Sequence, residues 1–310
     1  MNKGASRESY LCVRPKPPFR LDFTVWTLRR RPDNILDRWD NRTYRRVIVL
    51  EEEPAEISVS QTGSAENPLL NVTIAGIAAP PINRVRAFLE TMLGINVDLS
   101  DFYRFAKRNP QLEQLMERFC GLKPPRFPSI FEALVNGITC QQLTLTLGVH
   151  LLNKLTLNYG AKLDLPGGSA YAFPRPTDLV NLKVENFRQI GYSRHKAEAL
   201  IELSAKIISG ELDLANIEGM DYESALEQLD RLRGVGRWTG EYVLLRGLGR
   251  LRVFPVDDVG GRNSLQRWLK TPQKLDAEEA KRLLSAWDPY GGLLYFHLLL
   301  EGLKQKGIIE

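Results

Sequence analysis

The stretch LRGVGRWTGEYVLLRGLGRLRVFPVDDVGGRNSLQ, residues 232–266, decides the fold of this chain. It begins with a short hairpin that contains Gly234 and Gly236, and an apolar helix follows from Arg237. Glycine has no Cβ, so both glycines can adopt positive φ and let another backbone approach closely. The first N–H groups of the helix have no helical acceptor, which suits a phosphate. The residues predicted to form this phosphate-binding surface are Gly234, Val235, Gly236, Arg237 and Thr239.

On its own, the hairpin could equally be an ordinary helical turn with a glycine cap. Tyr222 to Arg231 has the pattern of a helix, so the unit is expected to be helix, hairpin, helix. Trp238 and Tyr242 then lie on one face of the second helix, since residues four apart are neighbours there. The carboxylate of Asp258 follows after a short loop. The aromatic face and the nearby carboxylate favour a functional hairpin over a purely structural turn.

These residues resemble the helix-hairpin-helix and aspartate signature of the base-excision DNA glycosylase superfamily. The pattern L-x-G-V-G-x-W-T, an apolar helix, and F-P-x-x-D ending at Asp258 is more narrowly similar to the DNA-3-methyladenine glycosylase II family. The resemblance implies an enzyme of base excision repair that acts on duplex DNA containing alkylated bases. Such an enzyme flips purines of the 3-methyladenine or 7-methylguanine type into a pocket and hydrolyses the N-glycosidic bond. An abasic site remains.

The resemblance makes Asp258 the catalytic residue and places Trp238, Tyr242 and Tyr290 around the flipped base. Tyr290 stands where a tryptophan is more usual in the family. Cleavage of the bond develops positive charge on the sugar, which one carboxylate can stabilise while it orients water. A purine that is already cationic leaves without a second carboxyl group as proton donor, and aromatic faces attract such a ring. The neighbouring Asp257 is expected to cap the next helix.

The segment FEALVNGITCQQLT, residues 131–144, is similar to the family helix that ends in a glutamine and a wedge residue. The wedge fills the gap left by the flipped nucleotide, and the candidates here are Gln142 and Leu143. Relatives that also nick the strand carry a lysine two residues after the second hairpin glycine. This chain has Trp238 at that place, so we expect a monofunctional glycosylase.

Composition sets the broad class. The 310 residues, 43% hydrophobic and 25% charged, are typical of a globular chain of about two domains. Cys12, Cys120 and Cys140 lie far apart, so neither a zinc site nor a disulfide framework is expected. No cysteine follows Cys140, which excludes the iron–sulfur branch of the superfamily. We expect no cofactor or catalytic metal; a monovalent cation bound by hairpin carbonyls, as relatives suggest, stays open.

The net charge of +5 weakly favours a polyanionic partner. Residues 1–50 contain 12 Lys and Arg against 5 Asp and Glu, so the excess lies near the N-terminus. No signal peptide or membrane helix is recognisable. We expect an intracellular monomer in the cytoplasm or nucleoid, without membrane contact. A second group of basic residues surrounds the hairpin and loop, of which a few would suffice to follow phosphates: Arg231, Arg233, Arg237, Arg246, Arg250, Arg252 and Arg262.

The chain order predicts an α+β protein, with a small antiparallel β domain followed by an all-α core of two helical subdomains. Residues 10–75 have β patterns, including an alternation of apolar and polar residues over 21–25, and helices are predicted from residue 84 onward. His195 is expected at the surface, whereas His150 and His297 are expected in the core. The expected domains are residues 1–81, a helical subdomain of 82–128 with 251–310, and residues 129–250.

Two other interpretations remain. A non-enzymatic protein that binds DNA structures would use the hairpin only for phosphates and would need neither Asp258 nor the aromatic face. An oxidised-purine glycosylase with lyase activity would need the missing lysine.

Overall fold

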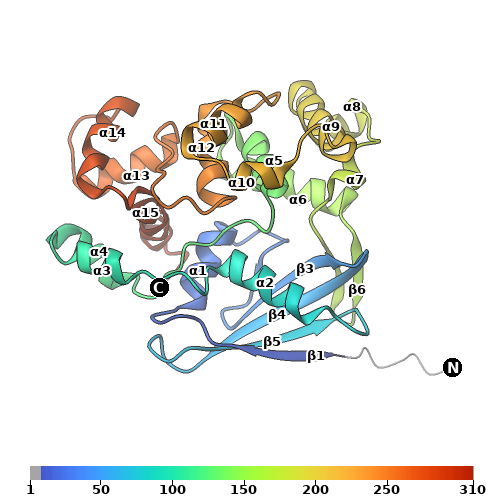
Figure 1. Ribbon diagram of the computed structural model, residues 1–310, viewed down its shortest axis with the longest axis horizontal. Helices are drawn as coiled ribbons and strands as arrows, with labels where there is room; N and C mark the ends of the chain where they lie inside the picture. The colour runs from blue at the N-terminus through green and yellow to red at the C-terminus, as the bar shows by residue number, and fades with distance from the viewer. Residues whose placement is uncertain (1–7, 310) are drawn as a thin grey trace.

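The computed structural model describes residues 8–309 and has an antiparallel sheet at the N-terminus followed by helices (Figure 1). The sheet has five strands in the order β1-β5-β4-β3-β2. Apolar residues such as Ile57 and Ile74 pair across neighbouring strands, which buries one set of side chains under the helices. The strands are β1 (Ser9–Val13), β2 (Arg38–Trp39), β3 (Thr43–Leu50), β4 (Glu53–Thr62) and β5 (Leu69–Ala75). The predicted fold class is confirmed.

The alternating segment at residues 21–25 is not a strand, and that prediction was wrong. It belongs to helix α1 (Leu21–Arg29), in which every residue except Asp22 is buried. A helix buried on all sides has no polar face, so helical periodicity is absent from its sequence. Thr24 and Thr27 turn their hydroxyl groups back to backbone carbonyls four residues earlier, which hides their polarity inside the core.

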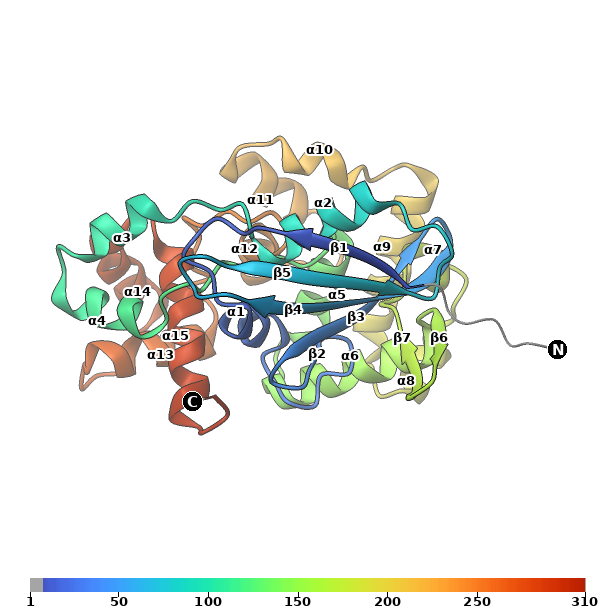
Figure 2. The same cartoon turned by 90° about the horizontal axis from the view of Figure 1, so that it is seen from below.

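The prediction that helices follow the sheet is confirmed, and the first of them begins at Ile82. Most of them lie on one side of the sheet, and those within residues 100–118 and 259–284 lie beyond its end (Figures 1 and 2). One short hairpin, β6 (Lys162–Leu165) and β7 (Gly168–Tyr171), interrupts them and packs beside β3 through Val47, Ala170 and Ala172. The helices are α2 (Ile82–Leu93), α3 (Ser100–Ala106), α4 (Pro110–Arg118), α5 (Ile130–Cys140), α6 (Leu145–Tyr159), α7 (Pro176–Leu179), α8 (Val184–Gln189), α9 (Arg194–Ser209), α10 (Leu214–Glu218), α11 (Tyr222–Asp230), α12 (Arg237–Arg246), α13 (Val259–Leu269), α14 (Ala277–Leu284) and α15 (Gly291–Gln305).

One hydrophobic core extends from the sheet through most of the helices. At its centre α5 and α12 lie close together, because a Cβ on Gly137 would come within 2.7 Å of the Thr239 side chain. His297 is buried as predicted, whereas His150 is exposed on α6, contrary to prediction. Across residues 8–309 the longest apolar helices are too short or too polar to cross a bilayer.

Candidate functional site

The predicted helix-hairpin-helix is present as α11, residues 231–236 and α12. Gly234 has a φ of 74°, as expected for the turn, and Val235 closes it by donating its N–H to the carbonyl of Leu232 at 3.0 Å. Gly236 does not have the positive φ we expected; its backbone is extended, with φ −116° and ψ −177°. A Cβ built at Gly236 would have no neighbour within 4 Å. The protein therefore leaves the outer side of this residue open.

The start of α12 is suited to an anion. Gly236 occupies the N-cap and has no side chain to satisfy the first amides, whereas the first turns of α5 and α9 are capped by serine hydroxyls. Val235 and Thr239 both have buried side chains, so they can contribute only backbone groups. Unpaired N–H groups and the helix dipole together attract negative charge at this point.

The arginines around the hairpin are less available than the sequence suggested. Arg246 is fully buried and donates to the carbonyl of Thr27 at 2.9 Å, so it is not among the arginines that could follow phosphates. Arg250 and Arg262 donate to backbone carbonyls. The remaining arginines have acidic partners, namely Arg231 with Glu227, Arg233 with Glu198 and Glu202, Arg237 with Glu241, and Arg252 with Asp288. Backbone amides, rather than a block of free positive charge, distinguish this surface.

Trp238 and Tyr242 form a stacked pair on α12, with ring centroids 5.6 Å apart and planes 28° apart. Trp238 is partly exposed, while only 4% of Tyr242 is accessible. Tyr242 therefore supports Trp238 from behind. Its hydroxyl accepts a hydrogen bond of 2.9 Å from Arg30, which follows α1. Sequence reasoning missed Arg30, because 212 positions separate it from Tyr242.

Tyr290 is not brought to this pair. Its ring packs on α3, at 5.4 Å from Phe102 and 5.0 Å from Phe105. Within residues 8–309 no ring contact joins Tyr290 to Trp238 or Tyr242. Tyr290, the residue before α15, therefore contacts α3 rather than the aromatic pair, and its place in the base pocket stays a prediction.

Asp258 is fixed through both of its carboxylate oxygens. Oδ1 accepts the N–H of Gly260 at 2.8 Å, which makes Asp258 the N-cap of α13. Oδ2 accepts the hydroxyl of Tyr295 at 2.5 Å. Asp257, which the sequence predicts as the cap, is exposed instead. The capping role therefore falls on Asp258, the residue for which the sequence predicts the chemical role.

Tyr295 is the main contact of Asp258 that sequence reasoning missed. It lies in the apolar run of α15, where a tyrosine is indistinguishable from core. Burial, and then the charge of Asp258, raise the pKa of its phenol well above the ordinary value, so the phenol stays protonated and donates. A Cβ on Gly261 would lie 2.9 Å from the Tyr295 ring. Glycine at this position lets the ring reach the start of α13.

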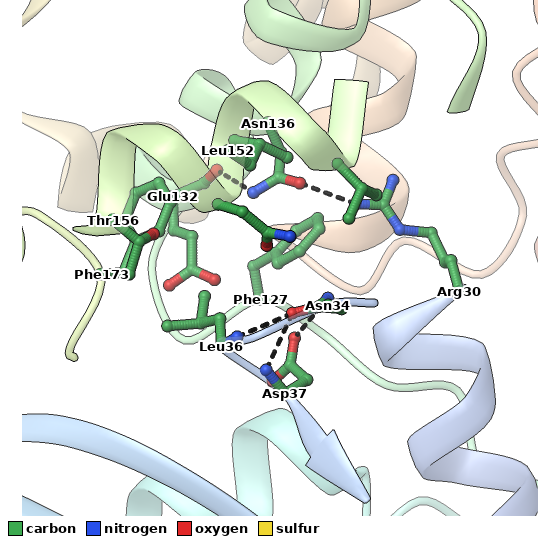
Figure 3. Close-up of a pocket in the computed structure, with 12 residues that line it drawn as sticks. Arg30, Asn34, Leu36, Asp37, Phe127, Glu132, Asn136, Leu152, Thr156 and Phe173 are labelled. Atoms are coloured by element: carbon green, nitrogen blue, oxygen red, sulfur yellow. Dashed lines mark hydrogen bonds between the residues drawn. The ribbon is translucent and has the colours of Figure 1, made fainter. Parts of the chain in front are cut away.

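A small hollow of about 20 Å³ lies beside the site, between the segment after α1 and helices α5 and α6 (Figure 3). Arg30 separates it from the aromatic pair, since one guanidinium nitrogen donates to Tyr242 and another to Asn136 at 2.8 Å. Next to the hollow, Arg46 is buried between Asp37 at 2.7 Å and Glu132 at 2.5 Å. These contacts connect the N-terminal part of the chain to the helices that carry the site.

The predicted wedge lies on the turn between α5 and α6. Gln142 is exposed and has a φ of 55°, whereas Leu143 is partly buried. Gln142 is thus the side chain that protrudes. The thiols of Cys12, Cys120 and Cys140 are all free.

Comparisons with known proteins concern the family and the fold. Residues 135–289, half of the chain, match the family model described as HhH-GPD superfamily base excision DNA repair protein. The match begins within α5 and includes the hairpin, Trp238 and Asp258. The chain is 28% identical over 211 residues to a DNA-3-methyladenine glycosylase of Bacillus subtilis (strain 168), covering 68% of this chain and 70% of the relative.

Two solved structures share the fold. The 3-methyladenine DNA glycosylase from Archaeoglobus fulgidus has a TM-score of 0.82 at 24% identity, and the alignment covers 96% of this chain and 100% of that one. The 8-oxoguanine glycosylase/lyase of Clostridium acetobutylicum, in complex with double-stranded DNA, has a TM-score of 0.75 at 18% identity, covering 99% and 100%. At these identities the likeness concerns the fold alone.

Proposed function

Because this chain belongs to the HhH-GPD superfamily of base excision DNA repair proteins, we propose that it is a monofunctional DNA glycosylase for alkylated purines. It flips a base of the 3-methyladenine or 7-methylguanine type out of duplex DNA and hydrolyses the N-glycosidic bond. The observation that carries the proposal is the fixed carboxylate of Asp258, held by Gly260 and Tyr295. The printed name of the Bacillus subtilis relative supports the same substrate class.

In this mechanism Asp258 stabilises the positive charge that develops on the sugar as the bond breaks. Hydrogen bonds to both oxygens keep the carboxylate in place, so little reorganisation is needed during the reaction. The partly exposed indole of Trp238, backed by Tyr242, receives the extruded base. A cationic methylated purine gains about 0.5–2 kcal/mol from an aromatic face and needs no proton donor to leave.

The absence of lyase chemistry rests on Trp238, which stands where a Schiff-base lysine would be needed. The nearby Lys196 is engaged, because its ammonium group donates to the carbonyls of Thr139 and Gln141 at 2.8 Å each. Neither side chain offers a free amine. The product is therefore an intact strand with an abasic site.

DNA is held at the hairpin. A phosphate approaches the open side of Gly236, and the first backbone amides of α12 donate hydrogen bonds to it. Gln142 enters the gap that the flipped nucleotide leaves. The carbonyls of Leu232 and Gly234 already accept hydrogen bonds, from the N–H of Val235 at 3.0 Å and from the side-chain amide of Gln141 at 2.6 Å, so a monovalent cation at the hairpin would have to share these oxygens. The chain acts on duplex DNA as a monomer.

The experiment that tests this function is release of free bases, identified by mass, from methylated duplex DNA. Release of 7-methylguanine and 3-methyladenine, with intact strands, is the expected result. A second duplex containing 8-oxoguanine tests the reaction of the Clostridium acetobutylicum protein. Exclusive release of 8-oxoguanine would make this chain an oxidised-purine glycosylase, and tight binding without any release would make it a DNA-structure binder.

A further inference from the structure

The turn that carries Gln142 has an unusual backbone. A residue other than glycine rarely adopts positive φ, and it keeps that conformation only where its surroundings hold it there. Gln142 does so with its side chain exposed, so packing of that side chain is not what holds it. The contacts that hold the turn must come from its neighbours.

The first contact comes from the hairpin. The side-chain amide of Gln141 donates to the carbonyl of Gly234 and to the hydroxyl of Thr239, both at 2.6 Å. Gly234 is the left-handed residue of the hairpin, and Thr239 lies in the first turn of α12. One side chain thus joins the residue before Gln142 to both parts of the proposed phosphate site.

The second contact comes from α9. The last carbonyls of α5 have no helical partner, and Lys196 satisfies those of Thr139 and Gln141 with hydrogen bonds of 2.8 Å each. Lys196 lies in the first turn of α9, behind its serine cap. Burial lowers the pKa of this lysine. The end of α5 is therefore held from two sides by groups that neither the phosphate grip nor the chemistry uses.

We propose that Gln141 and Lys196 are positioning residues that couple the grip on the DNA backbone to the insertion of Gln142. The inference rests on the proposed function and adds two residues to it. Because the hairpin and the turn are joined by hydrogen bonds, phosphate binding at the hairpin sets how deeply Gln142 enters the duplex. Without these bonds the hairpin still binds phosphate, but the turn no longer drives extrusion.

The test separates binding from extrusion in the full chain. Gln141→Met keeps the length of the side chain and removes its hydrogen-bond donors. Gln111→Met is the matched control, because Gln111 lies on the surface of α4 and its side-chain amide also donates to a backbone carbonyl, that of Trp268. Lys196→Met removes the second contact, and Lys196→Arg keeps donors and should restore function. Equal melting temperatures establish that each variant is folded.

Insertion is read from the fluorescence of 2-aminopurine opposite an abasic analogue, which reports unstacking whether or not any base is excised. We expect Gln141→Met and Lys196→Met to bind undamaged duplex as the parent does at one salt concentration, yet to lose the fluorescence rise. Excision of a paired methylated purine should fall about tenfold, and the defect should shrink in single-stranded DNA, where no extrusion is needed.

Unchanged fluorescence in both variants would overturn the coupling, and so would an equal loss of excision on single-stranded and duplex substrates. If the parent released no base at all, the proposed function would fail, while the fluorescence result would still decide for or against the coupling.

Discussion

Replacing Tyr295 with phenylalanine tests whether the hydrogen bond to Asp258 contributes to the reaction. The change removes one oxygen, which donates to Oδ2 of Asp258 at 2.5 Å, and leaves the ring and its packing on Phe254 in place. A hydrogen bond to a charged group is worth about 1.5–3 kcal/mol. If the bond persists in the transition state, the excision rate should fall about 10- to 150-fold.

The assay is single-turnover release of 7-methylguanine with enzyme in excess, together with affinity for undamaged duplex. Affinity should not change, because Tyr295 is not part of the hairpin. Tyr159→Phe is the matched control, because Tyr159, at the end of α6, also donates a hydrogen bond from its hydroxyl group, to the carbonyl of Asn186 at 3.1 Å. A Tyr295→Phe protein that excises at the parent rate would refute the reasoning that Asp258 depends on this bond. A control that loses as much as Tyr295→Phe would do the same.

Three further predictions concern the grip, the leaving group and the core. Gly236→Val should fold normally, since the extended backbone suits valine and nothing crowds the site. Its binding to damaged and to undamaged duplex should weaken by the same factor, about tenfold at fixed salt. Affinity equal to that of the parent would show that the hairpin is not part of the DNA interface. Cationic methylated purines should be released much faster than neutral lesions, and borohydride should trap no covalent adduct because Trp238 cannot form an imine; a trapped adduct would contradict the monofunctional mechanism. Burial lowers the pKa of His297 to about 4. As pH falls below the ordinary value of about 6.5, the unfolded chain takes up a proton before the folded chain does, so stability should drop by up to about 3 kcal/mol towards pH 4. Urea unfolding of His297→Leu should show a shallower loss over this range, and an equal slope would exclude His297 as the cause.

The local features of the site could be predicted from the sequence. The hairpin, the α12 helix and Asp258 lie within one short stretch, and each has a local signature: glycine spacing, an apolar run, an aspartate before a helix. The left-handed conformation at Gly234 followed from the same pattern. Features that depend only on neighbouring residues in the sequence could therefore be predicted.

Features that depend on tertiary contacts could not be predicted from the sequence. Tyr295 reaches Asp258 across 37 positions, and no local pattern distinguishes it from the core residues around it. Tyr290 directly precedes α15, the helix that contains Tyr295, and no local pattern indicates that its ring packs on α3. Arg246 has the composition of a surface residue but is buried behind Tyr242, where its guanidinium lies 5.8 Å from the ring.

The prediction of a strand at residues 21–25 failed for a related reason. Pattern reasoning depends on one side of an element facing water, and α1 has no such side. The exposed position of His150 is the converse case, since α6 has apolar residues such as Leu147 and Leu157 facing outward. Apolar neighbours therefore did not indicate burial there.

The central claim is that Asp258 catalyses release of an alkylated base, and single-turnover excision by Asp258→Asn tests it most directly. The amide keeps the shape of the side chain but cannot stabilise a developing cation. With folding and duplex affinity close to those of the parent, release of 7-methylguanine should fall by about 100-fold or more. Asp257→Asn, one position away and exposed, should excise as the parent does. Normal release by Asp258→Asn, or loss of release in Asp257→Asn alone, would contradict the account.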